Sequence, residues 1–498
     1  MTDGHHVADP VDGTGALEAR RHLVFRMATN TVVQAAGTVL GSAIAFVTFV
    51  VMTRGLGPES FGHFTAASIF LFIPVVLADV GLSAAVLREI SAAPNRTEEL
   101  MRASIGLRFL LSLAAVAVAL AIGLLAPFAE QTKTAMLISS VGALFTLLNL
   151  SLLPVLQVQL KMHWAVAGNL LGRLVTLGTT IGAVAAGLGF AAIVAATSLG
   201  LVVTFLFDLA FVRRLVSVRP RFHPAAWRSL VRASLLLGLS GALGQIYFRI
   251  DTVLLALLRP PEEVGIYGAA YKFIEIGELV IAFVSVSILP TLVRFVEEGN
   301  PRARRLTQKG FDIVVAVSAP LAVVLFAFAD DIVVLASGRE FAGAALALRL
   351  LVPFLLAVVV NQLLWRVLVA ARRDRELLAL SASILVVNVA LNVALIPEYG
   401  YRAAALVSLA SEVTLLIFVA IAVRRAVSFL PSPRYAGLVA GGAALMAAVV
   451  VVLRDAPPLL AGALALAVYG TMLAAAPGTV RETIVDLAAG LRRHGARA

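Results

Sequence analysis

Five charged residues lie inside two neighbouring apolar stretches, where charge is costly. Arg249 and Asp251 belong to the first stretch, and Lys272, Glu275 and Glu278 belong to the second. An unpaired charge in hydrocarbon is strongly unfavourable, so ionisable residues in such stretches mark functional sites by default. A guanidinium donates paired hydrogen bonds to a phosphate or a carboxylate. The five residues therefore predict a charged functional site.

The spacing of the five charges predicts how they pair. Lys272, Glu275 and Glu278 recur every third residue and so share one helix face. A rise of about 1.5 Å per residue, counted from the turn between the two stretches, places Asp251 level with Lys272 and Arg249 nearly level with Glu275. We expect ion pairs Asp251–Lys272 and Arg249–Glu275, which an anionic ligand would open. The alternative is that these charges only hold the two helices together.

Three asparagines in later apolar stretches are weaker candidates for the same site. Asn361 lies in one stretch, and Asn388 and Asn392 lie four residues apart in the next, on one helix face. Their amides can hydrogen-bond the hydroxyl groups of a ligand, or they can bond from helix to helix inside the membrane. Both interpretations stay open.

The elements that must position these residues are membrane-spanning helices. About fourteen apolar stretches fill the chain between Thr31 and Ala476, and a helix needs about 20 apolar residues to cross hydrocarbon. Hydrophobic residues make up 60% of the chain and charged residues 14%, with a mean hydropathy of +0.97. The sequence predicts an all-α polytopic membrane protein with about 14 transmembrane helices.

An internal repeat predicts how those helices are grouped. Residues 203 positions apart match at two turns: Pro58, Glu59, Gly62, Ala66 and Ala67 against Pro261, Glu262, Gly265, Ala269 and Ala270. Both turns follow a span of the same direction, so we expect two pseudo-symmetric six-helix lobes with the ligand path between them. The predicted divisions are a cytoplasmic tail (1–30), an N-terminal lobe (31–212), a cytoplasmic linker (213–232), a C-terminal lobe (233–425), two additional transmembrane helices (426–476) and a cytoplasmic tail (477–498).

The distribution of positive charge predicts the orientation. With the N-terminus inside, 29 of the 40 Lys and Arg residues lie on the cytoplasmic side, 6 lie outside and 5 lie within spans. We therefore expect a multi-pass protein of the bacterial cytoplasmic (inner) membrane with both termini cytoplasmic. The net charge of +11 is dispersed between spans, which argues against nucleic acid as a partner. The chain has no cysteine, so disulfides and thiolate metal sites are excluded.

Several motifs in order resemble one family, the polysaccharide flippases of the multidrug/oligosaccharidyl-lipid/polysaccharide exporter superfamily, over about residues 30 to 425. The matching groups are Arg54, Gly55, Leu56, Gly57, Pro58, Phe61 and Gly62 with Asp79, Gly81 and Leu82; Arg249, Ile250 and Asp251 with Tyr267; Gly338, Phe341, Ala342, Ala344 and Arg349; and Asn388, Leu391, Asn392, Ile396, Pro397, Tyr399 and Gly400. Arg402 departs from the pattern, because the family has a small residue there.

The resemblance implies a flippase that moves a polyprenyl-pyrophosphate-linked oligosaccharide from the inner to the outer leaflet by alternating access. Its product would serve a surface polysaccharide such as O-antigen lipopolysaccharide or an exopolysaccharide. The expected substrate-binding residues are Arg249, Lys272, Asn361, Asn388 and Asn392, and the expected charge-pair or ion-coupling residues are Asp251, Glu275 and Glu278. Membrane lipids and a polysaccharide polymerase are the implied partners of a monomer. No cofactor or metal is expected, and coupling to H⁺, to Na⁺ or to the membrane potential stays open.

Three other functions are weighed against this one. A cation-coupled drug or metabolite antiporter of the same superfamily would need an acid-rich site, and the first span, Thr31 to Thr53, contains no acid. A peptidoglycan-precursor flippase is chemically close to a polysaccharide flippase. Such proteins usually have a basic residue inside the first span, and this chain has none there. A membrane glycosyltransferase or polymerase would need carboxylates in a sizeable loop, and the longest expected outer loops have about a dozen residues. We therefore expect a transporter and not an enzyme.

Overall fold

A computed structural model describes residues 13–475 except 80, 93–94, 96, 219–223, 299, 301 and 454–455. Every regular element in this described part is helical. The N-terminal half comprises α1 (Gly13–Asp79), α2 (Leu82–Ala92), α3 (Thr97–Leu125), α4 (Glu130–Asn149), α5 (Leu153–Val158), α6 (Met162–Ala185) and α7 (Gly189–Val212).

The C-terminal half has the same character and ends in two further helices. It comprises α8 (Pro224–Tyr247), α9 (Ile250–Leu258), α10 (Pro261–Glu297), α11 (Arg302–Ala327), α12 (Ala329–Ser337), the short 3₁₀ turn η2 (Arg339–Phe341), α13 (Ala344–Ala370), α14 (Asp374–Tyr399), α15 (Tyr401–Val427), α16 (Arg434–Val452) and α17 (Pro458–Ala475). Helix α13 is buried along most of its length and contacts α10, α11 and α15. It forms the centre of this half.

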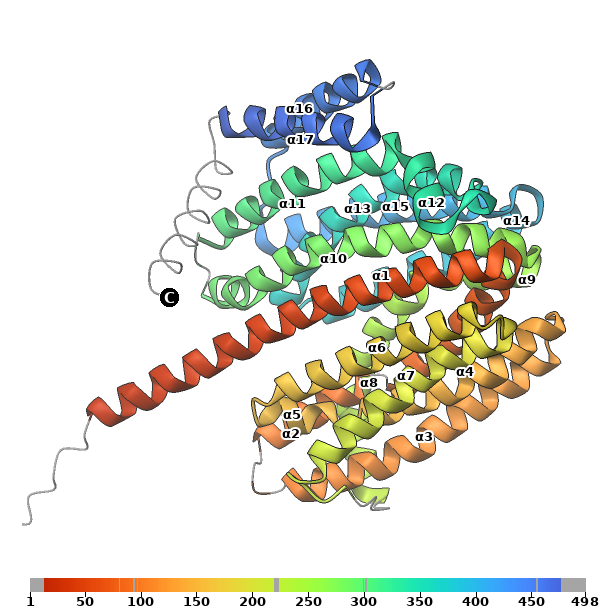
Figure 1. Cartoon of the computed structure of the whole chain (residues 1–498). Helices are drawn as coiled ribbons and strands as arrows, with labels where there is room; N and C mark the ends of the chain where they lie inside the picture. Colours follow the sequence, from red (N-terminus) through yellow and green to blue (C-terminus); the bar gives the residue numbers. More distant parts are fainter. Residues whose placement is uncertain are drawn as a thin grey trace, which may run out of the picture.

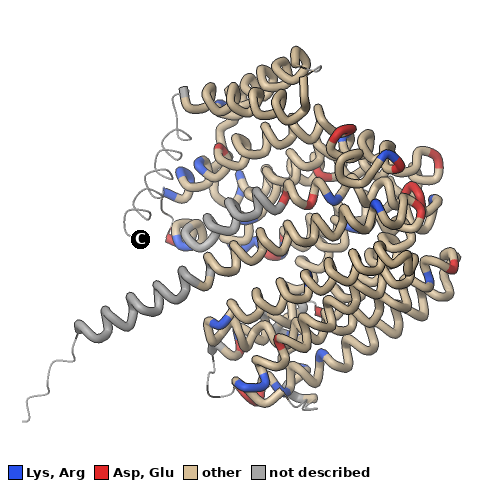
Figure 2. The backbone as a smooth tube through the Cα atoms, in the orientation of Figure 1, with Lys and Arg blue, Asp and Glu red and all other residues tan. Residues whose placement is uncertain are grey.

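The helices gather into two bundles that run roughly side by side in Figure 1. Helices α3, α4, α6 and α7 form the N-terminal bundle, and α9 to α15 form the C-terminal bundle. Helix α1 lies between the bundles, in contact with α6 on one side and α10 on the other. Helices α16 and α17 form an outer layer over α11. Figure 2 shows most charged residues toward the two ends of the helices, as a membrane-spanning bundle requires.

Helix α1 breaks sharply at Gly57, which has φ 71° and ψ 171°. Only glycine adopts such a backbone conformation at little cost, and Pro58 then fits the first turn of the helix that follows. The break reverses the chain at one end of the bundles. We call this end, with Gly57, Pro261 and Gly400, the joint end, and the opposite end, where α1 begins and α15 finishes, the tail end.

The two bundles meet at the joint end through a reciprocal backbone contact. A Cβ atom added to Gly62 would lie 1.7 Å from the carbonyl oxygen of Pro261, and one added to Gly265 would lie 2.0 Å from that of Pro58. Residues 203 apart thus exchange the same contact, the pattern that a two-fold axis produces. Arg54 strengthens the junction by donating to the carbonyl oxygens of Leu335 at 2.5 Å and Ala336 at 3.1 Å.

Nine helices in the described residues are long and apolar enough to cross a membrane, or ten if the bent pair α8–α9 counts as one span. This number is smaller than the fourteen expected from the sequence. Helices α6 and α10 are not among the nine, and two further differences have clear reasons. The segment Val32–Asp79, which contains the Gly57 break, counts once. The apolar helix Pro458–Ala474 falls short of the length required.

Two expected boundaries differ from the structure. Helix α1 begins at Gly13, inside the segment 1–30 that was expected to be a cytoplasmic tail. The segment LEARRHLVFRMA is rich in strong helix formers, so helix continues through it. Helix α8 begins at Pro224, inside the expected linker, and its first turns pack on the N-terminal bundle, where Leu230 joins Leu82 and Val86. Residues 1–12 and the expected tail 477–498 lie outside the described residues.

Candidate functional site

A broken helix sets the geometry of the candidate site. Helix α8 ends at Tyr247 and α9 begins at Ile250, with a bend of 43° between them. Arg249 occupies the N-cap position of α9, with φ −128° and ψ −11°. A helix that starts within a membrane points free backbone N–H groups and a positive dipole end into its surroundings, which favours anions. The break was not predicted from the sequence.

Arg249 forms the ion pair predicted with Glu275 of α10. The guanidinium Nη2 lies 2.6 Å from a carboxylate oxygen of Glu275, and Lys272 Nζ lies 2.8 Å from the other oxygen. The Arg249 guanidinium also lies over the rings of Phe72 and Tyr271, 5.5 and 5.8 Å from their centroids. One carboxylate thus holds two cations, and an aromatic ring from each half of the chain flanks the guanidinium.

The predicted pair between Asp251 and Lys272 is wrong. Asp251 is 2% exposed and accepts hydrogen bonds from Tyr267 Oη at 2.5 Å, Ser408 Oγ at 2.9 Å and its neighbour's backbone N–H at 2.6 Å. The prediction counted the rise per residue along one straight helix. The break at Arg249 instead turns Asp251 toward α10 and α15. Asp251 therefore ties three helices together, while Lys272 bonds within its own helix.

A cavity of about 390 Å³ lies between the two bundles at this site. Arg249, Lys272 and Glu275 line it from the C-terminal side. The remaining lining comes from α1, α6, α7 and α10: Ala45, Thr48, Phe49, Met52, Phe61, Phe64, Thr65, Ser68, Ile69, Asn169, Gly172, Arg173, Thr176, Thr197, Gly200, Leu201, Thr204 and Gly268. The cavity therefore combines apolar and hydroxyl-bearing walls with a charged corner.

Arg173 on α6 is a lining residue that the sequence interpretation missed. It donates to Asn169 Oδ1 at 2.8 Å and to the carbonyl oxygen of Gly41 at 2.9 Å, and it has no acidic partner in the described part of the chain. The available signal was a lone arginine four residues after an asparagine inside an apolar stretch. With Arg173, Arg249 and Lys272 against Glu275, cations outnumber carboxylates in the cavity.

Asn361 lies in a second cavity, of about 360 Å³, inside the C-terminal bundle. Its amide nitrogen donates to Glu412 at 2.7 Å, and Tyr247 Oη donates to the same carboxylate at 3.0 Å. Glu278 stands on the lining face of α10, but it is absent from the lining of either cavity, and its Oε1 is buried without a hydrogen-bond partner. The structure thus separates both residues from the Arg249 cavity.

Asn388 and Asn392 are buried between α14 and α15, at 1% and 0% exposure. Asn392 donates to Asn388 Oδ1 at 2.9 Å, and Asn388 donates to Ser411 Oγ at 3.1 Å. Of the two interpretations, hydrogen bonding within the bundle is the one this arrangement shows. Neither residue lines the described cavities.

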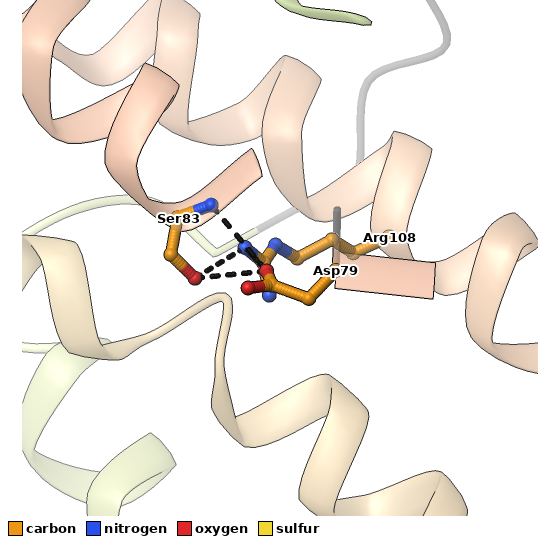
Figure 3. Close-up of polar contacts among 3 residues, drawn as sticks. All are labelled: Asp79, Ser83 and Arg108. Carbon is orange, nitrogen blue, oxygen red and sulfur yellow. Dashed lines mark hydrogen bonds and ion pairs between the residues drawn. The ribbon is translucent and has the colours of Figure 1, made fainter. Parts of the chain in front are cut away.

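A third charged group lies near the tail end of the N-terminal bundle (Figure 3). Arg108 of α3 lies 2.6 Å from both Asp79 Oδ1 and Ser83 Oγ, and Ser83 also donates to Asp79 at 2.9 Å. The Arg108 side chain is 3% exposed and lines none of the described cavities between the bundles. This group fixes the turn between α1 and α2, in which Gly81 has φ 71° and packs against the backbone of Gly238.

Comparison with known proteins agrees with this architecture. The family model described as polysaccharide biosynthesis protein matches residues 27–296, and the MatE model matches residues 237–394. A protein of Haloferax volcanii described as the probable low-salt glycan biosynthesis flippase Agl15 is 24% identical over 373 residues, which is 74% of this chain and 77% of that protein.

Solved structures share the fold. A structure of the lipid II flippase MurJ in an inward closed conformation has a TM-score of 0.74 at 14% identity and covers 88% of this chain and 97% of that one. An inward-facing multidrug resistance MATE family transporter has a TM-score of 0.67 at 18% identity, covering 78% and 94%. This chain belongs to the polysaccharide biosynthesis protein family of the multidrug/oligosaccharidyl-lipid/polysaccharide superfamily, a family of transporters and not of enzymes.

Proposed function

We propose that this protein moves a polyprenyl-pyrophosphate-linked oligosaccharide from the inner to the outer leaflet of the bacterial cytoplasmic membrane, for surface polysaccharide synthesis. The cavity between the two bundles supports this proposal most strongly. Three cations and one carboxylate line it, and two of those cations share that carboxylate. An excess of positive charge in a low-dielectric cavity suits a pyrophosphate and opposes a cationic drug.

Each charged side chain has a separate part in the proposed binding step. Arg249 makes the first contact, because its guanidinium can exchange the Glu275 carboxylate for pyrophosphate oxygens through the same paired donors. Lys272 neutralises Glu275 when Arg249 leaves it. Arg173 approaches from the opposite bundle and has hydrogen-bond donors to spare. Asn361, Asn388 and Asn392 have no part in headgroup binding in this proposal.

The proposed orientation places the joint end outside. With both termini cytoplasmic, the reciprocal contact of Gly62 and Gly265 would close the path on the outer side. The Gly57 break divides α1 into two spans, and α3, α4, α6, α7, α8–α9, α10, α11 and α13–α17 supply the other twelve. Alternating access then requires the joint to open and the tail end to close.

Energy coupling has two candidate routes in this proposal. An anionic headgroup that moves outward gains about 2.3 kcal/mol per charge per 100 mV from an inside-negative potential. Alternatively Glu275 exchanges its cation partners for H⁺ or Na⁺ when substrate leaves. Asp251 serves this role less well, because four hydrogen bonds already satisfy its carboxylate and it does not line the cavity.

The test measures the leaflet distribution of polyprenyl-linked glycan in spheroplasts with a membrane-impermeant glycan label. We expect the label to lose access in a deletion strain, and in strains that produce Arg249→Ala or Arg173→Ala at normal abundance. Arg373→Ala is the matched control, because Arg373 is an exposed arginine paired with Glu376 at a helix end. Unchanged access in the deletion strain, with no second flippase present, would refute the proposal.

A further inference from the structure

A groove at the tail end of the C-terminal bundle has the composition of a lipid headgroup site. It has a volume of about 600 Å³ and lies between the start of α11 and the connection from α15 to α16. Three arginines line it, Arg304 and Arg305 from α11 and Arg434 from α16. None of the three has an acidic partner among the described residues. The groove is far from the cavity that contains Arg249 and shares no lining residue with it.

The groove is held in shape by contacts within the protein. Gln308 donates to the carbonyl oxygen of Ser432 at 3.1 Å and accepts from its N–H at 2.7 Å, so the connecting segment is clamped to α11. The Arg304 guanidinium lies 4.8 Å from the centroid of the Phe429 ring. The groove also contains Asp312, which accepts a hydrogen bond from Gln308 at 2.8 Å. Its net charge is therefore positive.

The groove lies where two apolar helices begin. Arg304 is the third residue of α11 and Arg434 is the first residue of α16. At about 1.5 Å per residue, Arg304 lies about 10 Å before Phe311, where the apolar part of α11 starts, and Arg434 directly precedes the apolar part of α16. Leu430 and Leu438 add apolar surface to the same groove. Clustered cations between transmembrane helices, beside apolar side chains, complement a phosphate on a glycerol backbone.

We propose that this groove binds an anionic phospholipid, independently of the glycan proposed as the transported substrate. The phosphate lies among Arg304, Arg305 and Arg434, and the glycerol lies against Leu430 and Leu438. The lipid fills the space between α11 and the outer layer of α16 and α17, and so joins that layer to the C-terminal bundle.

Native mass spectrometry of the delipidated protein tests this site. We expect dioleoyl phosphatidylglycerol to bind and dioleoyl phosphatidylcholine to bind at least about tenfold more weakly. The triple variant Arg304→Ala/Arg305→Ala/Arg434→Ala should lose phosphatidylglycerol affinity by about tenfold or more. Millimolar inorganic pyrophosphate should leave the lipid bound. Displacement by pyrophosphate would identify the groove as a site for free phosphates and would overturn the proposal.

A second triple variant controls for general attraction to positive charge. Arg372→Ala/Arg373→Ala/Arg375→Ala removes the same charge from the same end of the bundle, at the connection from α13 to α14. We expect it to retain phosphatidylglycerol affinity within about twofold. An equal loss in both variants, or equal binding of phosphatidylcholine, would refute the site. If the first triple variant does not fold, Arg305→Glu alone should still weaken phosphatidylglycerol binding, and unchanged binding there would count against the proposal.

Discussion

The chain contains two repeat-related helical hairpins. The first is formed by the two arms of α1 on either side of Gly57, and the second by α8, α9 and α10. They share a backbone joint and differ in the charged side chains that they carry. Gly62 and Gly265 make the same contact on opposite sides of the joint. Subtracting 203 from the positions of the four charges Arg249, Asp251, Lys272 and Glu275 gives Phe46, Thr48, Ile69 and Phe72, none of which carries a charge. The first hairpin has thus kept the mechanical contact, and the charged chemistry is confined to the second. Each of the two similar lobes must contribute its own glycine to the joint, whereas the cations of one lobe are enough to bind one headgroup.

The joint provides the largest expected effect. Gly62→Ala would place a Cβ atom 1.7 Å from the Pro261 carbonyl oxygen, so the bundles cannot close there without moving apart. We expect glycan transport to fall by about tenfold or more, since contacts under 3.0 Å do not occur between real Cβ atoms and backbone. Because the native chain has no cysteine, single cysteines introduced beside the joint report its opening to an impermeant maleimide. Their labelling should increase in this variant.

Matched positions decide whether the joint is symmetric. Gly265→Ala should reproduce the effect of Gly62→Ala, because its Cβ atom would lie 2.0 Å from the Pro58 carbonyl oxygen. Gly178→Ala should leave transport and labelling unchanged, since the added methyl group would meet open space beyond its own turn of helix. If only one of the two joint variants affects labelling, the reciprocal contact is not the gate.

Two arginines with different exposure should separate stability from transport. Arg108 is 3% exposed and paired with Asp79, whereas Arg249 is 30% exposed and lines the cavity. Arg108→Met removes a 3%-exposed guanidinium from Asp79, whose side chain is 28% exposed and keeps its hydrogen bond from Ser83, and should cost about 1–3 kcal/mol of stability. Arg249→Met leaves Glu275 with Lys272 and should alter stability little, while transport falls by about tenfold or more. Both variants are tested by thermal unfolding in detergent and by the leaflet assay. A large drop in the unfolding midpoint of Arg249→Met, or an unchanged midpoint in Arg108→Met, would contradict the prediction.

The sequence predicted the repeated turns and one ion pair correctly, but it did not predict the surroundings of Asp251 or the position of Arg173. The 203-residue repeat and the pair Arg249–Glu275 could be found, because turn residues and depth along regular helices follow from spacing alone. Asp251 could not be placed, since the helix break beside Arg249 depends on packing against α10 and α15. Arg173 was missed because its partners are a backbone carbonyl on α1 and a neutral amide, which leave no charge pattern in the sequence.

The hydrogen bonds around Asp251 should support the second hairpin rather than transport. Tyr267→Phe removes one buried donor to a carboxylate, a loss of about 1.5–3 kcal/mol. Ser408→Ala removes a second side-chain donor, which belongs to α15, and should cost a similar amount. Both variants should lower the unfolding midpoint and keep normal transport at normal abundance. A transport defect in a fully folded Tyr267→Phe protein would instead place Asp251 in the coupling mechanism.

The smallest expected effect concerns a contact between an aromatic ring of the first hairpin and a charged side chain of the second. Phe72 is the repeat counterpart of Glu275, and its ring lies 5.5 Å from the Arg249 guanidinium. Phe72→Leu keeps most of the apolar volume and removes the cation–π contact, which is worth about 0.5–1 kcal/mol beside a partly exposed guanidinium. We expect a two- to fivefold reduction in substrate affinity, with an unchanged unfolding midpoint. Phe72→Tyr retains the aromatic face and should bind nearly as well as the native protein. Equal losses in both variants would mean that the shape of the wall, and not the ring beneath the guanidinium, determines headgroup binding.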